Sequence, residues 1–351
     1  MERRSNPFAL LLHFGAALAV GVGLAGCGVG RPPAAPVDEV ADVVPLTPDT
    51  SPIGLRRSVV ADQYFWLRAK ALEGEAPAPF ADALAAMRDL RAELADDPTA
   101  WEDLDVPLGT VRRASELAAA YAELPMRKDV GGKLVSFRAK ALTLARAMEA
   151  SEAAYRAGPF REHDAEIARA AKDLSARLLP NADTILRTLE HDMALPGASR
   201  PIVITLVADA PYPSVFAADA RGLSTASFVR VHGLEGGALV ETVLHESLHA
   251  IDELTVRSPT AMNALRAALT RDGGDETNPS VEMAVNTVTF AEAASLVRRF
   301  VDPKHRPLGE SGFYTLFPPA PAIVEAWNRR IDGADLDVTA RAIAEAVAGA
   351  D

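Results

Sequence analysis

Between about Ser58 and His191, apolar residues recur at spacings of three and four in a background rich in Ala, Leu, Arg and Glu. This spacing places apolar side chains on one face of a helix, so it predicts amphipathic helices. Proline and glycine interrupt the pattern near residues 74–79, 98, 107, 125–132, 158–159 and 180. We therefore expect about five helices of ordinary length in this region.

After Pro196 and Gly197 the pattern becomes typical of strands. Residues 201–207 are rich in β-branched side chains, and residues 226–232 alternate apolar with polar. The second segment is the more amphipathic and is predicted to be an exposed edge strand. Further helices are expected over residues 238–254 and from Asn278 to Arg299. The predicted fold is α+β and predominantly helical, with a helical domain over residues 55–195 and a domain with a small sheet over residues 196–351.

The N-terminus carries Arg3 and Arg4, then an apolar stretch, then Leu24-Ala25-Gly26-Cys27. These residues resemble a bacterial lipoprotein signal peptide over residues 1–26, in which Cys27 is lipidated and becomes the first mature residue. Several glycines make the stretch a poor spanning helix, although a transmembrane helix is the alternative. We expect an extracytoplasmic protein that contacts the membrane through its lipid anchor only. The resemblance favours the outer membrane where the source has two membranes, because no Asp follows Cys27.

Residues 27–54 contain six prolines among Ala, Val and Asp, and this composition favours an extended tether. The whole chain of 351 residues is 49% hydrophobic and 24% charged, which is typical of a globular protein. A net charge of −12 argues against a nucleic-acid partner. Because Cys27 is the only cysteine, an intramolecular disulfide and a multi-cysteine metal cluster are excluded.

The helix predicted after Gly237 contains His245-Glu246-Ser247-Leu248-His249, which matches the pattern H-E-x-x-H. At about 100° per residue, the two histidines lie within about 40° of each other on the helix. Neutral imidazoles are good zinc donors, and a carboxylate beside the metal can accept a proton from water. An apolar stripe on another side of the helix is expected to bury it; it comprises Val240, Leu244, Leu248 and Ile251.

At these residues the sequence resembles the zincin superfamily of zinc metallopeptidases, whose core is a small sheet with an edge strand beside the H-E-x-x-H helix. The resemblance covers about residues 200–300 and implies that His245 and His249 bind Zn²⁺ and that Glu246 is the general base. Asp252 and Thr255 stand where the metzincin branch has Gly and His, and peptide deformylases need a cysteine ligand. The resemblance therefore favours the gluzincin branch, whose third ligand is a glutamate from a later helix.

Glu282, in the first turn of the helix after Asn278, is the preferred third ligand, with Glu292 and Glu276 as alternatives. A carboxylate in a first turn also complements the helix dipole without any metal. Asp252 shares the metal-facing side of its helix and is expected to orient a ligating histidine or solvent. Tyr314 and His305 are weaker candidates for donors to a substrate oxyanion, and ordinary core packing is the preferred interpretation of such a tyrosine.

Two functions fit these residues. The first is a lipid-anchored zinc metallopeptidase that hydrolyses peptide or protein substrates with Glu246 as the base. The second is a binding or scaffold lipoprotein that keeps the fold without turnover. Glu246 favours the enzyme, because a binding protein has no use for a base beside the metal.

Overall fold

The structure is a computed structural model that describes residues 42–48, 51–73, 77–95, 97–195, 202–218, 225–254, 260–271 and 278–349. Its strands are β1 (Val43–Pro45), β2 (Ile53–Ser58), β3 (Lys128–Val130), β4 (Lys133–Val135), β5 (Ile202–Val207), β6 (Ser214–Ala218) and β7 (Thr225–Arg230). Its α-helices are α2 (Val59–Lys70), α3 (Ala81–Leu94), α4 (Pro98–Leu108), α5 (Ala114–Ala122), α6 (Phe137–Ala157), α7 (Pro159–Leu178), α8 (Ala182–Asp192), α9 (Gly236–Leu254), α10 (Ala261–Leu269), α11 (Pro279–Phe300), α12 (Phe313–Leu316), α13 (Ala320–Ile331) and α14 (Leu336–Ala348). The described chain is mostly helical with a small mixed sheet, which agrees with the predicted α+β class.

Five strands form the main sheet in the order β1-β2-β5-β7-β6. The central strands β2, β5 and β7 are parallel, and β1 and β6 run antiparallel to them at the two edges. The prediction that residues 226–232 form the exposed edge is therefore wrong, because β7 lies between β5 and β6. The actual edge, β6, is a short strand with little alternation in its sequence, so its pattern did not reveal it.

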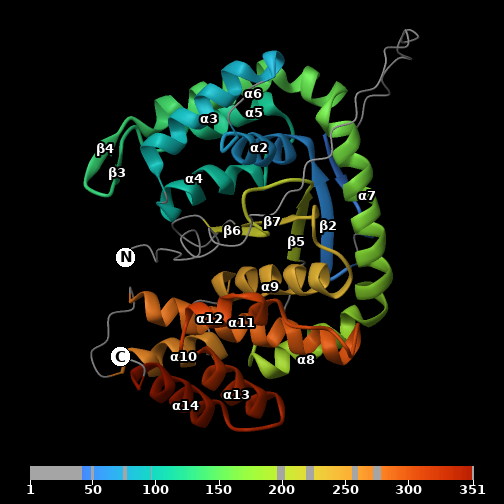
Figure 1. Cartoon of the computed structure of the whole chain (residues 1–351), viewed down its shortest axis with the longest axis vertical. Coiled ribbons are helices and arrows are strands. Elements are labelled where there is room, and N and C mark those ends of the chain that lie inside the picture. The colour runs from blue at the N-terminus through green and yellow to red at the C-terminus, as the bar shows by residue number, and fades with distance from the viewer. Residues whose placement is uncertain are drawn as a thin grey trace.

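One face of the sheet is covered by helices α2 to α6, which lie above it in Figure 1. Ser58 ends β2 and caps α2, where its side chain accepts a hydrogen bond from the backbone N–H of Ala61 at 3.3 Å. Nearly all of α2 is buried, from Val59 to Arg68, because it lies between the sheet and the helices above it. Buried apolar side chains of α2 to α6 form one core, the upper core, and Phe228 of β7 belongs to it.

Helix α9 packs against the opposite face of the sheet, across β5, β6 and β7. Below it lie α10 to α14, as Figure 1 shows, and α7 runs along one side of the molecule from the upper helices to the lower ones. The lower core contains Leu206 and Val229 from the sheet and Leu244 and Leu248 from α9, all buried. Helix α9, which carries H-E-x-x-H, thus lies between the sheet and a layer of helices.

The predicted division of the chain at residue 195 does not coincide with the two apolar cores. Ile167 and Leu174 of α7 and Ile185 of α8, expected in the helical domain, are buried in the lower core. Residues 43–45 and 53–54, expected in the tether, are strand residues, and Ile53 is fully buried. The expected tether therefore does not extend to residue 54, because β1 pairs with β2 and β2 pairs with β5 in the sheet.

Among its described residues, the region from 58 to 191 contains seven α-helices, α2 to α8, where about five were expected. The break at Gly158 and Pro159 is confirmed, since α6 ends at Ala157 and α7 begins at Pro159. Pro107 does not interrupt a helix as expected but lies in the last turn of α4. The segment around residues 125–132 leads into the hairpin β3–β4, which projects from the upper helices in Figure 1.

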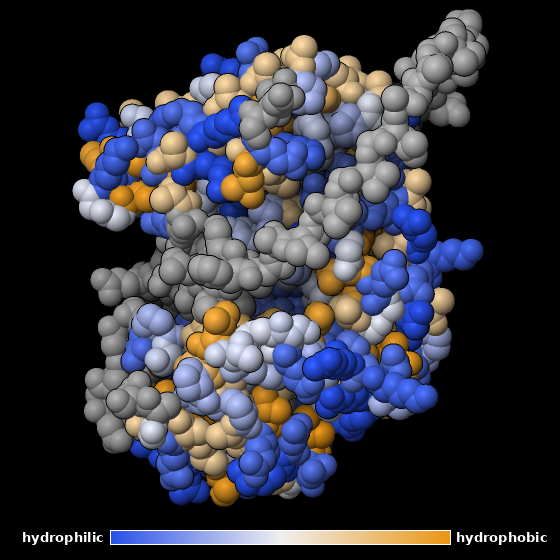
Figure 2. All heavy atoms as spheres, viewed as in Figure 1, coloured by the Kyte–Doolittle hydropathy of each residue, from blue (hydrophilic) through white to orange (hydrophobic). Residues whose placement is uncertain are grey.

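The face in Figure 2 is largely polar, with apolar side chains in small separate patches. In the described part of the chain, no helix combines the length and the apolarity needed to cross a bilayer. The expected signal segment (residues 1–26), Cys27 and most of the expected tether lie outside the described residues.

Candidate functional site

The H-E-x-x-H segment lies in the middle of α9, as predicted. The expected apolar stripe does bury this helix: Val240 and Leu244 are fully buried, Leu248 is 1% exposed and Ile251 is 6% exposed. These side chains fix the rotation of α9 against the sheet. The histidines are consequently directed to the side of α9 that faces β6 and α11.

His245 and His249 converge through the same ring atom. Their Nε2 atoms are 3.0 Å apart, and the ring planes are inclined by 81°. Two Zn–N bonds of about 2.05 Å at a tetrahedral angle would separate the nitrogens by about 3.3 Å, so a small adjustment would admit a zinc ion. Within the described residues, the buried Nδ1 of His245 has no hydrogen-bond partner.

Both imidazoles are held neutral at neutral pH. Burial lowers the pKa of His245 well below its usual value, and the neighbouring His249 lowers it further. Burial also lowers the pKa of His249 to about 4, although the carboxylate of Asp252 opposes the shift. Neutral imidazole is the form that donates a lone pair to a metal, so these shifts favour metal binding.

Three further side chains orient the histidines. The ring of Phe290 stacks on His245 with centroids 4.1 Å apart, and Phe216 of β6 stacks on His249 at 5.8 Å. The side chain of Asn286 is hydrogen-bonded to His249. The sequence analysis missed all three residues. Asn286 and Phe290 follow Glu282 at intervals of four residues on α11, so the helical spacing carried a signal that they share its face.

Glu246 is buried at 3% exposure and faces the edge strand. Burial raises its pKa to about 7, although a hydrogen bond with Ser214 at the start of β6 opposes the shift. Its Oε2 atom is buried and has no hydrogen-bond partner in the described part of the chain. A carboxyl group with this pKa can both accept and release a proton near neutral pH.

Glu282, the expected third ligand, does not join the two histidines. Arg266 of α10 lies between it and Asp252: Arg266 Nε is 3.6 Å from Glu282 Oε1, and its two terminal nitrogens are 3.0 and 2.6 Å from the Asp252 oxygens. Asp252, expected beside a histidine or solvent, is instead held by Arg266, and its charge still acts on His249. Among the described residues, no three His, Cys, Asp or Glu side chains stand at metal-ligand spacing.

Of the two alternative ligands, Glu292 is not grouped with the histidines. Glu292 lies on α11 and is fully buried, and it accepts a hydrogen bond from Trp327 of α13 at 2.9 Å. Burial raises its pKa to about 8, and Asp192 of α8 adds to the shift. Glu276 lies outside the described residues.

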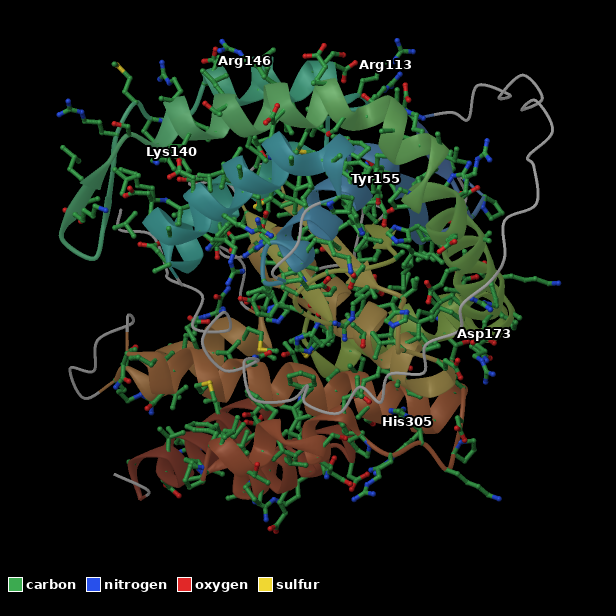
Figure 3. All side chains as sticks on the ribbon, turned by 45° about the horizontal axis from the view of Figure 1, so that its top comes forward. Arg113, Lys140, Arg146, Tyr155, Asp173 and His305 are labelled. Carbon is green, nitrogen blue, oxygen red and sulfur yellow. The ribbon has the colours of Figure 1, made fainter. Side chains whose placement is uncertain are left out.

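The weaker candidates His305 and Tyr314 are packed against the lower helices. His305 Nε2 is hydrogen-bonded to the buried carboxylate of Glu241, one turn before His245, so this imidazole is not directed at a substrate. Figure 3 shows His305 low in the molecule, far from Tyr155 in the upper helices. The ring of Tyr314 lies against Gly309, where an added Cβ would be only 2.3 Å from it. Burial raises the pKa of Tyr314 above its usual value, so its hydroxyl stays protonated.

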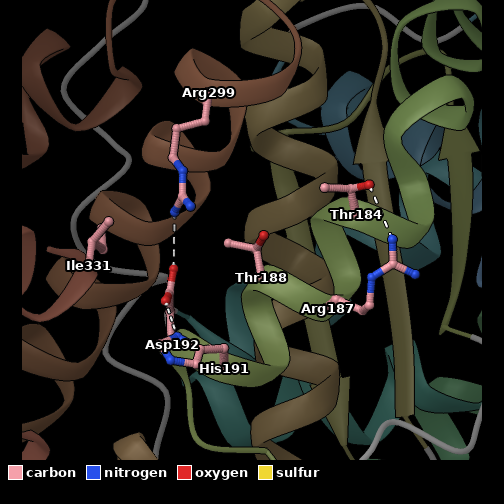
Figure 4. A pocket seen from close by; sticks show the side chains of 7 residues that line it. All are labelled: Thr184, Arg187, Thr188, His191, Asp192, Arg299 and Ile331. Carbon is pink, nitrogen blue, oxygen red and sulfur yellow. Dashed lines mark hydrogen bonds and ion pairs between the residues drawn. The ribbon is translucent and has the colours of Figure 1, made fainter. Parts of the chain in front are cut away.

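A surface pocket lies elsewhere, between α8, α11 and α13 (Figure 4). It contains none of the predicted site residues, and it is lined by Thr184, Arg187, Thr188, His191, Asp192, Arg299 and Ile331. Arg299 is in the last turn of α11 and pairs with Asp192 at 3.2 Å. A cation at a helix C-terminus complements the helix dipole, which accounts for this arginine without a ligand.

Comparisons of this chain with family models, with curated proteins and with solved structures find no match. The chemistry of the α9 site therefore follows from its own residues. They are two neutral imidazoles with convergent nitrogens and a buried carboxyl group whose pKa is about 7.

Proposed function

We propose that this chain is a zinc-dependent hydrolase of peptide bonds and that its catalytic centre is the α9 site. One observation carries the proposal: the Nε2 atoms of His245 and His249 lie 3.0 Å apart, and the next residue along α9, Glu246, carries a buried carboxyl group. Buried polar atoms of a core are usually hydrogen-bonded, whereas Nδ1 of His245 has no partner among the described residues.

In this proposal each residue has one role. His245 and His249 would hold the zinc ion, with Glu282 as the third ligand once it leaves Arg266. When bound, zinc supplies Lewis acidity, which makes water a nucleophile near neutral pH and polarises the substrate carbonyl. Glu246 would accept the proton of the attacking water and transfer it to the leaving amine, and a pKa of about 7 suits both transfers.

The arrangement around α9 supports peptides as the substrate class. In the described residues β6 pairs with β7 alone, and Ser214 at its start contacts Glu246. An extended peptide can bind such an edge through its backbone groups, which would bring a peptide bond to the histidines. An edge strand beside the H-E-x-x-H helix is also what the resemblance to zincins implies. Lipid anchoring at Cys27 and an extracytoplasmic location belong to the same proposal.

A catalytically inactive binding or scaffold lipoprotein is the second candidate. The observation in its favour is the ion pair between Arg266 and Glu282, since a third ligand is not assembled at the histidines. Glu246 separates the two candidates, because only the hydrolase needs it as a proton acceptor.

The test measures zinc and hydrolysis on the same samples. Purified wild type should bind about one zinc per chain, and Glu246→Gln should keep the zinc while hydrolysis of a peptide library falls by at least about 10²-fold. Glu292→Gln is the matched control, since it also neutralises a buried carboxyl group with a raised pKa but lies away from the histidines.

Two results would count against the hydrolase. Zinc binding without any wild-type turnover would favour the binding lipoprotein. Failure of the wild type to take up zinc would remove the site itself.

A further inference from the structure

Arg266 is placed between two carboxylates that belong to the α9 site. Its side chain is 9% exposed, and it reaches from α10 to Asp252 on α9 and to Glu282 on α11. Burial lowers the pKa of Arg266, but the two carboxylates outweigh burial and raise it above its usual value. The guanidinium is therefore charged at every relevant pH.

The two contacts of Arg266 are unequal. Asp252 receives two parallel hydrogen bonds, at 3.0 and 2.6 Å, which is the strong bidentate geometry of arginine and carboxylate. Glu282 Oε1 lies 3.6 Å from Nε, so this contact is longer than those to Asp252, although Glu282 also helps to raise the pKa of Arg266. Asp252 thus anchors the guanidinium, and the contact with Glu282 is the one that can open at the lower cost.

We propose that Arg266 competes with the metal for Glu282 and thereby sets the zinc affinity of the site. This inference rests on the proposed function, in which His245 and His249 bind zinc. Glu282 lies one helical turn before Asn286, the residue that is hydrogen-bonded to His249, so it is on the face of α11 that is directed at the histidines. While Glu282 pairs with Arg266, the site offers zinc two imidazoles. Release of Glu282 supplies the third ligand.

A positive charge beside a metal ligand opposes a dication in two ways. It stabilises the carboxylate in the orientation that does not bind metal, and it repels the zinc ion directly. The second effect does not depend on Glu282, since removal of any nearby cation favours a bound dication. An experiment on Arg266 must therefore separate competition for Glu282 from simple repulsion.

A double-mutant cycle makes this separation. Zinc dissociation constants are measured on the full-length protein, purified in detergent, by competition with a coloured chelator for wild type, Arg266→Met, Glu282→Gln and the double variant. We expect Arg266→Met to tighten zinc binding by at least about 10-fold, within the range seen when groups around metal ligands are changed. In the Glu282→Gln background only the share due to repulsion should remain, so the gain from the same substitution should be at least about 5-fold smaller than in the wild-type background.

Each other outcome has a definite meaning. An equal gain in both backgrounds would show repulsion alone, and weaker binding in Arg266→Met would show that Arg266 positions Glu282 for the metal; either overturns the proposal. Should Arg266→Met unfold, as a melting curve would reveal, Arg266→Lys is measured instead. It keeps the charge but not the bidentate contact, and the same difference between the two backgrounds is expected with a smaller gain.

His245→Ala tests the underlying site independently. Unchanged zinc binding in this variant would overturn the proposed function. A loss of zinc in His245→Ala together with equal affinities in wild type and Arg266→Met would overturn the role of Arg266 alone.

Discussion

Two buried carboxyl groups on opposite faces of the sheet have contrasting surroundings. Asp62 of α2 accepts hydrogen bonds from the Tyr155 hydroxyl at 2.6 Å and the Ala208 backbone N–H at 2.7 Å, and it is 2.8 Å from His163 Nδ1. Glu246 of α9 has its hydrogen bond with Ser214, and its Oε2 has no partner among the described residues. Both side chains are buried to 3% exposure or less.

The difference shows how burial can serve structure or chemistry. Around Asp62 the donors come from α6, α7 and the end of β5, so one carboxylate joins three elements of the upper half. The pKa of His163 shows the same coupling: burial lowers it, but Asp62, together with Asp209 and Glu166, outweighs burial and raises it above its usual value. Glu246 contacts few elements, and its Oε2 has no partner among the described residues. Its ionisation therefore lowers the stability of the fold, but a carboxyl group with a pKa of about 7 can transfer protons near neutral pH.

The largest effect on folding is expected from Asp62→Ala. It would leave the hydroxyl of Tyr155 and the N–H of Ala208 buried without an acceptor, so the free energy of unfolding should fall by about 3–5 kcal/mol. Urea unfolding measures this loss. Asp89→Ala is the control, because Asp89 is exposed and its pairing with Lys140 is worth about 1 kcal/mol or less. A similar small loss for Asp62→Ala would show that the cluster does not join the upper helices.

A change of opposite sign is expected from Glu246→Gln in metal-free protein. The pKa of Glu246 is about 7 in the folded state against 4.5 when unfolded, so the unfolded state ionises first as pH rises. Wild-type stability should therefore fall between about pH 4.5 and 7, by about 3 kcal/mol from this group, and stay reduced above pH 7.

Glu246→Gln cannot ionise and should lack this loss, so its stability relative to wild type should increase across the same pH interval. Urea unfolding at pH 5 and pH 8 after chelation measures the difference. The histidines of the site are present in both proteins, so their titration largely cancels. If the free energies of unfolding of Glu246→Gln and wild type differ by the same amount at pH 5 and pH 8, the raised pKa of Glu246 is contradicted, and with it the contrast with Asp62.

A smaller effect is expected from Gly237→Ala. This substitution tests Glu241 of α9, a buried carboxylate that is hydrogen-bonded to His305. A Cβ at this position would be 2.6 Å from Nδ1 of His305 and would displace that ring from Glu241. Alanine gains up to about 1 kcal/mol in helix propensity, so a net loss of about 1–2 kcal/mol is expected from the overpacking.

Zinc affinity should not change in Gly237→Ala, because His305 is hydrogen-bonded to Glu241 and is not part of the proposed zinc site. Gly54→Ala is the control, since a Cβ there would meet its neighbours at 3.6 Å or more. A loss of zinc binding in Gly237→Ala but not in Gly54→Ala would show that the pair of Glu241 and His305 supports zinc binding.

The helix that bears the motif was predictable, and the neighbours of the motif were not. The spacing of Val240, Leu244 and Leu248 fixed which side of α9 is buried, because a helix has one period and an apolar stripe must face the core. The partners of Glu282 could not be found in the same way. Arg266 lies on a separate helix, and nothing in the local sequence states which carboxylates it will contact.

The sequence by itself determined the helical character of the chain, the α9 motif and the chemistry that two histidines and a glutamate at this spacing can perform. Tertiary structure alone decided that β6 rather than β7 is an edge, that residues 43–45 and 53–58 complete the sheet, and that Glu282 pairs with Arg266. Local patterns record periodicity and burial along one element, whereas strand order and ion pairing depend on which distant elements are brought together by the core.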